Sequence, residues 1–120
     1  MRTLTIRIES DASDALARAG QAFVAAWKSD GYTGETLSFE SPAALFRLLS
    51  PTRWSVLSAL QSRGSSGLRE LARHMGRDPS SVLRDVNALM ERGLIEKDEA
   101  GRLFVPYARI HTEFDLAKAA

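Results

Sequence analysis

The chain has 120 residues, of which 44% are hydrophobic and 26% charged, a composition typical of one small globular domain or of a domain with an appendage. It contains no cysteine, which excludes disulfides and thiolate metal sites, and its two histidines are isolated, so we expect no metal and no cofactor. No window approaches the roughly 18 apolar residues of a membrane helix, and residues 1–10 alternate polar and apolar instead of forming an apolar block. We therefore expect a cytoplasmic protein with no membrane partner.

The charge is unevenly distributed. The net charge of +1 and the isoelectric point of about 8.2 are low for a nucleic-acid-binding protein, for which values above about 9 are usual. Residues 51–110, however, carry ten Lys and Arg against seven Asp and Glu, whereas residues 1–50 carry five against six. The positive excess therefore lies in the second half of the chain.

The first third of the chain predicts a strand, a helix and a second strand. Polar and apolar residues alternate over residues 3–9 and again over residues 35–40, the period of a strand with one buried face. Between these strands, apolar residues recur at helical spacing until Gly31: Ala12, Leu16, Ala19, Phe23 and Trp27. We expect this segment, residues 1–41, to mediate dimerisation or to bind a partner.

Two Ser-Pro pairs predict two further helices. Ser41 with Pro42, and Ser50 with Pro51, each combine an N-cap residue with a proline at the first helical position. The second of these helices should stop near Gly64. We assign it as the first helix of a three-helix core.

Residues 66–93 predict two short amphipathic helices around a tight turn, which is the layout of a helix-turn-helix. Gly76 should end the first helix, Asp78 should cap the second, and Pro79 should begin it. The second helix is expected to bury Val82, Leu83, Val86, Leu89 and Met90. We expect Asp85 to pair with an arginine of the first helix, either Arg69 or Arg73.

Residues 94–107 predict a β-hairpin that would serve as a wing. Apolar Leu94 and Ile95 precede a polar stretch that turns at Gly101 and leads to apolar Leu103 and Phe104. The expected fold class is therefore α+β, with a winged helix-turn-helix over residues 42–107. Residues 109–116 alternate again, which predicts a strand within a C-terminal segment of strand and tail, residues 108–120. We expect both chain ends to share one small sheet, within a chain or between subunits.

The second helix of the motif should enter the major groove of DNA with its N-terminal half. Arg84 is the main candidate for a base contact because it can reach guanine O6 and N7, although an exposed arginine is also common on any solvated helix. The other candidates are expected to allow close approach or to meet phosphates. The residues we expect to contact DNA are Ser80, Ser81, Arg84 and Asn87 on this helix, Arg77 in the turn, Arg53 on the earlier helix and Arg102 at the wing tip. The amides at the helix start could also favour a phosphate, in competition with Asp78.

The sequence LRELARHMGRDPSSVLRDVNALMERGLIEKDEAGRLFVPY resembles winged-helix transcriptional regulators of the MarR and ArsR-like group. With FESPAALFRLLSPTRWSVLSALQSRG ahead of it, the chain is similar to small prokaryotic winged-helix regulators and to antitoxins encoded beside a small toxin. The resemblance covers residues 38–107, and residues 77–86 are its most distinctive part. It implies operator binding as a dimer and, for the antitoxin branch, a toxin-binding surface outside the winged helix.

We therefore expect a sequence-specific DNA-binding regulator that acts as a dimeric autorepressor. The alternative is an antitoxin that neutralises a cognate toxin protein and binds DNA for operon autoregulation. The expected partners are double-stranded DNA, a second copy of the chain and, in the alternative, the toxin; a winged helix that binds only proteins is a further possibility. We do not expect an enzyme, because no carboxylate pair, Ser/His/Asp set or nucleotide-binding loop appears.

Overall fold

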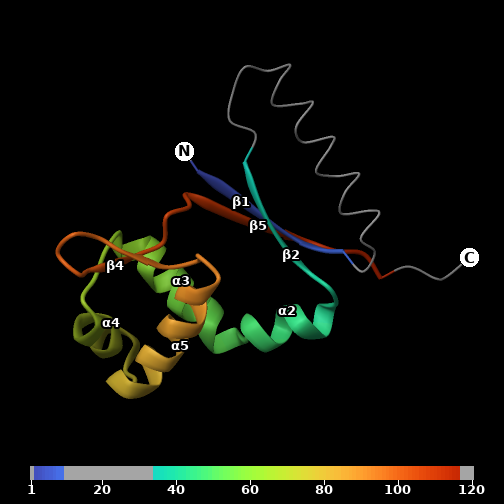
Figure 1. Ribbon diagram of the computed structural model, residues 1–120. Helices are drawn as coiled ribbons and strands as arrows, with labels where there is room; N and C mark the ends of the chain where they lie inside the picture. Colours follow the sequence, from blue (N-terminus) through green and yellow to red (C-terminus); the bar gives the residue numbers. More distant parts are fainter. Residues whose placement is uncertain (1, 10–33, 117–120) are drawn as a thin grey trace, which may run out of the picture. The chain divides into compact units, whose positions relative to one another are not determined.

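The computed structural model describes residues 2–9 and 34–116 (Figure 1). The chain forms two compact units. The first unit comprises residues 1–45 and 109–120, and the second comprises residues 46–108. The described residues have an α+β fold with four helices, a three-stranded parallel sheet and a two-stranded hairpin. None of these helices has the length and apolar character needed to cross a membrane. The helix expected between residues 11 and 30 lies outside the described residues.

The first unit contains three strands (Figure 1). They are parallel and lie in the order β2-β1-β5. Their bounds are Thr3–Ile8 for β1, Glu35–Phe39 for β2 and Arg109–Glu113 for β5. In the centre, Ile6 of β1 lies beside Leu37 of β2 and Thr112 of β5. The three predicted strands are confirmed, and so is the prediction that the two ends of the chain share one sheet.

The sheet has one apolar face and one polar face. Successive side chains of a strand point to opposite faces, and paired residues of parallel strands share a face. Leu4 and Ile6 are buried on one face, together with Phe39 of β2. On the other face, Arg7 Nη1 lies 3.0 Å from a carboxylate oxygen of Glu113 on β5. Apolar packing on one face of the sheet and an ion pair on the other therefore hold β1 and β5, from the two ends of the chain, together.

The second unit contains three helices that pack against one another, followed by a short hairpin (Figure 1). The bounds are Pro51–Arg63 for α3, Leu68–Met75 for α4, Pro79–Glu91 for α5, Glu96–Lys97 for β3 and Leu103–Phe104 for β4. Strands β3 and β4 are antiparallel, which confirms the predicted hairpin. Helix α2, Pro42–Leu48, lies where the chain passes from the first unit to the second.

Local sequence signals begin and end these helices where we predicted. The hydroxyl of Ser50 accepts a hydrogen bond from the Arg53 amide at the start of α3, and the Asp78 carboxylate caps α5 in the same way. Proline occupies the first helical position of both helices. Gly76 ends α4 with φ at 65°, a left-handed conformation that residues with a Cβ rarely adopt. The turn that aims α5 is thus encoded by three adjacent positions.

Apolar side chains from α3, α4, α5 and the hairpin region form the core of the second unit. The buried set is Val56, Leu57 and Leu60 of α3, Leu71 and Ala72 of α4, Val82, Val86 and Leu89 of α5, Leu94, Ile95 and Leu103 of the hairpin and its approach, and Leu49 and Tyr107 outside these elements. Burying each Leu, Ile or Val side chain contributes roughly 1.5–3 kcal/mol. This core fixes the face that α5 presents outward.

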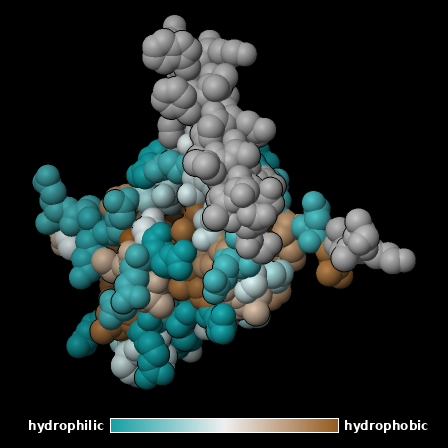
Figure 2. All heavy atoms as spheres, turned by 45° about the vertical axis from the view of Figure 1, so that its right-hand side comes forward, coloured by the Kyte–Doolittle hydropathy of each residue, from teal (hydrophilic) through white to brown (hydrophobic). Residues whose placement is uncertain are grey.

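The expectation that Leu83 belongs to the buried arc of α5 is wrong, because this residue is 41% exposed. At about 100° per residue, Leu83 lies about 100° around the helix from Val82 and about 60° beyond Val86, at the edge of the predicted arc. Other large apolar side chains are also exposed, among them Phe46 on α2. In the space-filling view, apolar residues show between the polar ones on the visible face (Figure 2).

Candidate nucleic-acid interface

The outward face of α5 carries most of the residues that we expected to read DNA. Ser80, Arg84 and Asn87 are exposed along this face, and Ser81 at its margin is half-buried. Leu83 and Glu91 are exposed on the same face. Because Val82, Val86 and Leu89 hold the opposite side of the helix in the core, this face is fixed in orientation within the unit.

Arg84 is available for an external contact. In the described part of the chain, no hydrogen bond or ion pair engages its side chain. Its exposed neighbour Leu83 adds an apolar group to a surface that is otherwise polar. Helical periodicity placed Leu83 in the buried arc, but the residue lies at the edge of that arc, where the packing of α5 leaves it exposed.

The first turn of α5 is already occupied by Asp78. The Ser80 hydroxyl and the Ser81 amide donate to this carboxylate and hold the pKa of Asp78 below its usual value, with a further hydrogen bond from the Ser80 amide. Asp78 is therefore ionised at neutral pH, and its oxygen accepts from the amides that we considered for phosphate binding. A phosphate at the start of α5 would therefore meet amides that are already hydrogen-bonded and the negative charge of Asp78, and both disfavour its binding there.

Three side chains form a connected ion-pair group, which we call the Asp85 cluster: Arg53, Arg77 and Asp85. Arg53 Nε donates to one carboxylate oxygen of Asp85 at 3.0 Å, and Arg77 Nη2 donates to the other at 2.9 Å. The Asp85 side chain is only 13% exposed. The expected pairing of Asp85 with Arg69 or Arg73 is wrong, because Asp85 on α5 lies toward the start of α3 and the turn, whereas those two arginines are exposed on α4.

The Asp85 cluster connects four segments of the chain: the end of α2, the start of α3, the turn before α5, and α5 itself. Besides Asp85, Arg53 Nη1 donates to the carbonyl oxygens of Arg47, at 3.3 Å, and Leu48, at 3.1 Å, at the end of α2. Arg77 connects the turn between α4 and α5 to the cluster. Its Nη1 atom is buried and has no hydrogen-bond partner among the described residues. With 21% and 25% of their side chains exposed, Arg53 and Arg77 hold α5 in place and present less charge outward than two free arginines.

The side chain of Arg102 is directed away from the tip of the hairpin. Its guanidinium donates to the Ser65 carbonyl oxygen at 3.1 Å and lies 3.3 Å from Glu70 on α4. The tip itself, residues 98–101, is organised by Asp98, whose carboxylate accepts from the amides of Ala100 and Arg102. Together with the exposed Glu99, this makes the tip of the hairpin acidic.

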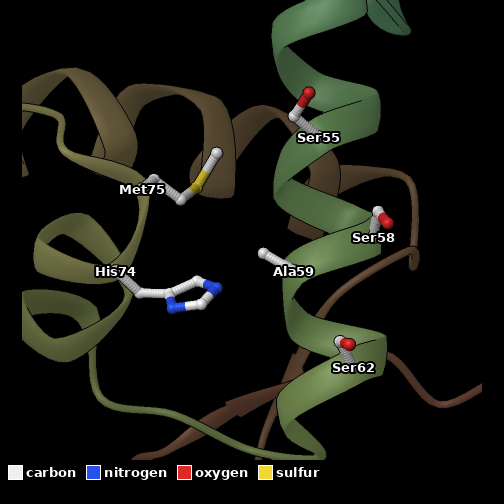
Figure 3. Close-up of a pocket in the computed structure, with 6 residues that line it drawn as sticks. All are labelled: Ser55, Ser58, Ala59, Ser62, His74 and Met75. Atoms are coloured by element: carbon white, nitrogen blue, oxygen red, sulfur yellow. The ribbon is translucent and has the colours of Figure 1, made fainter.

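A shallow hollow of about 380 Å³ lies between α3 and α4. Its lining is Ser55, Ser58, Ala59 and Ser62 of α3 with His74 and Met75 of α4 (Figure 3). The imidazole of His74 and the methyl group of Ala59 point toward each other across it (Figure 3), while the Ser55 hydroxyl donates back to the Pro51 carbonyl oxygen. His74 is an exposed residue.

Comparison with known proteins places the second unit in a family. No curated protein shows significant similarity to the chain. The model of the HVO_A0114 family matches residues 48–112, which is more than half of the chain. This range includes α3, α4, α5 and the hairpin, and therefore all residues of the Asp85 cluster and of the outward face of α5. The chain belongs to the HVO_A0114 family.

Proposed function

We propose that the chain is a sequence-specific DNA-binding transcriptional regulator, in which α3, α4, α5 and the hairpin act as a winged helix-turn-helix. The observation that carries the proposal is the outward face of α5, where the unengaged Arg84 stands between the small Ser80 and the amide of Asn87. A helix that follows a tight turn and presents such side chains has the chemistry needed to read base edges.

Each residue on this face has a suited base contact. Arg84 can donate two hydrogen bonds to guanine O6 and N7, and Asn87 can pair with adenine N6 and N7. Ser80 is small enough for the helix to approach the groove closely. Leu83, which is exposed beside them, can contact a thymine methyl group. The face therefore offers contacts for both kinds of base pair.

We assign the contacts to the DNA backbone from the cationic side chains that have no intramolecular partner among the described residues. In the described part of the chain, Arg69 and Arg73 on α4 and Lys97 on β3 have no hydrogen bond or ion pair and are exposed. We assign phosphate contacts mainly to these residues, because such contacts position a protein on DNA without reading sequence. Arg53 and Arg77 then act chiefly by holding α5 through the Asp85 cluster.

The test is a selection of bound duplexes from a random library, followed by fluorescence anisotropy on the enriched duplex and on a scrambled one. Arg84→Ala should lose about 1–3 kcal/mol of preference for the enriched duplex. Arg73→Ala removes the same charge from α4 and should weaken both duplexes equally. Failure of the selection to enrich any sequence, or equal behaviour of the two variants, would contradict base readout by α5.

A second function, that of an antitoxin that binds a toxin protein, is favoured by the acidic tip of the hairpin, which differs from the toxin-binding surface outside the winged helix that the resemblance implies. Asp98 and Glu99 would repel phosphates but suit a basic protein surface. The variant Glu99→Lys tests this directly, because Glu99 is exposed and has no partner among the described residues. Antitoxin function predicts that the product of a neighbouring gene co-purifies with the wild-type chain and less with the variant. A wing that lies against DNA predicts instead that the variant binds every duplex more tightly.

A further inference from the structure

The outer edge of β5 is the second surface of this molecule whose chemistry indicates a partner. Within the described residues, β5 has one neighbouring strand, β1, so its other side is a sheet edge with backbone groups available for pairing. The strand is short and its side chains alternate between exposed and half-buried. Its exposed positions are Arg109, His111 and Glu113.

These three positions form a charge pattern that is complementary to itself. When two identical strands pair in antiparallel orientation about His111, Arg109 of each copy lies directly opposite Glu113 of the other. On the opposite face, Ile110 lies opposite Thr112. A two-fold interface requires such self-complementarity, because each residue meets the symmetry mate of its partner.

The charges of the strand are arranged for this contact. Glu113 is already held by Arg7 Nη1 at 3.0 Å, and His111 Nε2 lies 3.1 Å from its carboxylate, so the acidic group is positioned before any partner arrives. Arg109, in contrast, is exposed and has no hydrogen bond or ion pair within the described part of the chain. It is the group that a second copy would engage.

We propose that two copies of the chain pair antiparallel through β5, with the two-fold axis at His111, and join their three-stranded sheets into one. Two Arg109–Glu113 ion pairs set the register, and the backbone groups of the two edges supply the remaining hydrogen bonds. The inference does not rest on DNA binding, because self-association is measured on the protein alone.

The test uses charge reversal in the full-length chain and sedimentation velocity without DNA. Arg109→Glu alone places like charges opposite each other at both contacts of the homodimer, and so does Glu113→Arg alone. Each variant should dimerise at least about tenfold more weakly than the wild type. An equimolar mixture of the two variants restores both attractive contacts and should recover a heterodimer of nearly wild-type affinity.

Control variants test whether this register, and not a different contact, holds the two copies together. Arg69→Glu reverses an exposed charge on α4 and should leave dimerisation unchanged. Because Glu113→Arg also removes the contact with Arg7, the milder Glu113→Gln is added to Arg109→Glu and should recover part of the lost affinity in a single chain. A monomeric wild type, unchanged single variants, or a mixture that stays monomeric would overturn the proposal. Recovery with Asp115→Arg in place of Glu113→Arg would also overturn it, because the two-fold axis would then lie at Thr112.

Discussion

The two units of this chain are specified by different kinds of information. In the helical unit, elements begin and end at residues that act locally, such as the Ser50 and Asp78 caps and the left-handed Gly76. In the sheet unit, β1 pairs with β5 from the opposite end of the chain, so no local signal specifies the partner. Local signals therefore define helices here, whereas burial and long-range pairing define the sheet, and the two units should respond differently to substitution.

The largest expected effects come from core truncations, one in each unit. Ile6 in β1 and Leu89 in α5 are both fully buried, so Ile6→Ala and Leu89→Ala should each cost about 2–5 kcal/mol of unfolding free energy. Urea denaturation followed by circular dichroism measures this cost. A loss below about 1 kcal/mol at Ile6 would contradict the view that burial in the central strand specifies the sheet.

The next-largest effect on stability should distinguish Asp85 from Glu70, two carboxylates that each form ion pairs with two arginines. Asp85 is 13% exposed and pairs with Arg53 and Arg77, whereas Glu70 is 45% exposed and pairs with Arg63 and Arg102. Asp85→Ala leaves half-buried guanidinium groups without a counter-charge and should cost roughly 3 kcal/mol. Glu70→Ala should cost under about 1 kcal/mol, because water screens exposed pairs. Equal costs in thermal or urea unfolding would contradict a structural role for the Asp85 cluster.

A smaller effect tests the local signal at the turn. Gly76→Ala forces a Cβ into a left-handed conformation and should cost about 1–2 kcal/mol, although no atom lies close enough to clash. Gly67→Ala is the control, because Gly67 has an ordinary extended backbone. Alanine is a poorer N-cap than glycine, but it also lowers the entropy of the unfolded chain, so the two effects offset and stability should change by less than about 0.5 kcal/mol. If the two variants lose equal stability, the conformation of Gly76 does not account for the turn.

The smallest effect is a dependence on acid at the start of α5. Hydrogen bonds from Ser80 and Ser81 lower the pKa of Asp78 in the folded chain from its usual 3.8. The folded state therefore binds the proton less readily, so the cap stabilises the fold fully above the unfolded pKa and loses its effect as pH falls through the folded pKa. Asp78→Asn keeps a capping side chain but does not titrate. Wild type and variant should differ in the slope of stability against pH below about pH 4, and parallel slopes would exclude this contribution.

The sequence predicted those features that depend on neighbouring residues. The caps, the turn at Gly76, the hairpin and the alternation of the three strands all follow from residues within a few positions of each other. The partners of Asp85 did not follow, because they depend on how α5 lies against the start of α3. The exposure of Leu83 and the direction of the Arg102 side chain likewise depend on packing among separate elements. The parallel pairing of β1 with β2 and β5 also did not follow from the sequence, because it depends on how segments far apart in the chain come together.

The central claim is that the outward face of α5 reads DNA sequence, and a salt titration tests it most directly. Binding of the wild-type chain to the DNA upstream of its own gene is compared with binding to a scrambled duplex of equal length. If α5 reads base edges, the chain should prefer the upstream DNA, and this preference should persist at physiological salt. A steep loss of binding with salt and no preference between the duplexes would show only a non-specific basic surface and would contradict the claim.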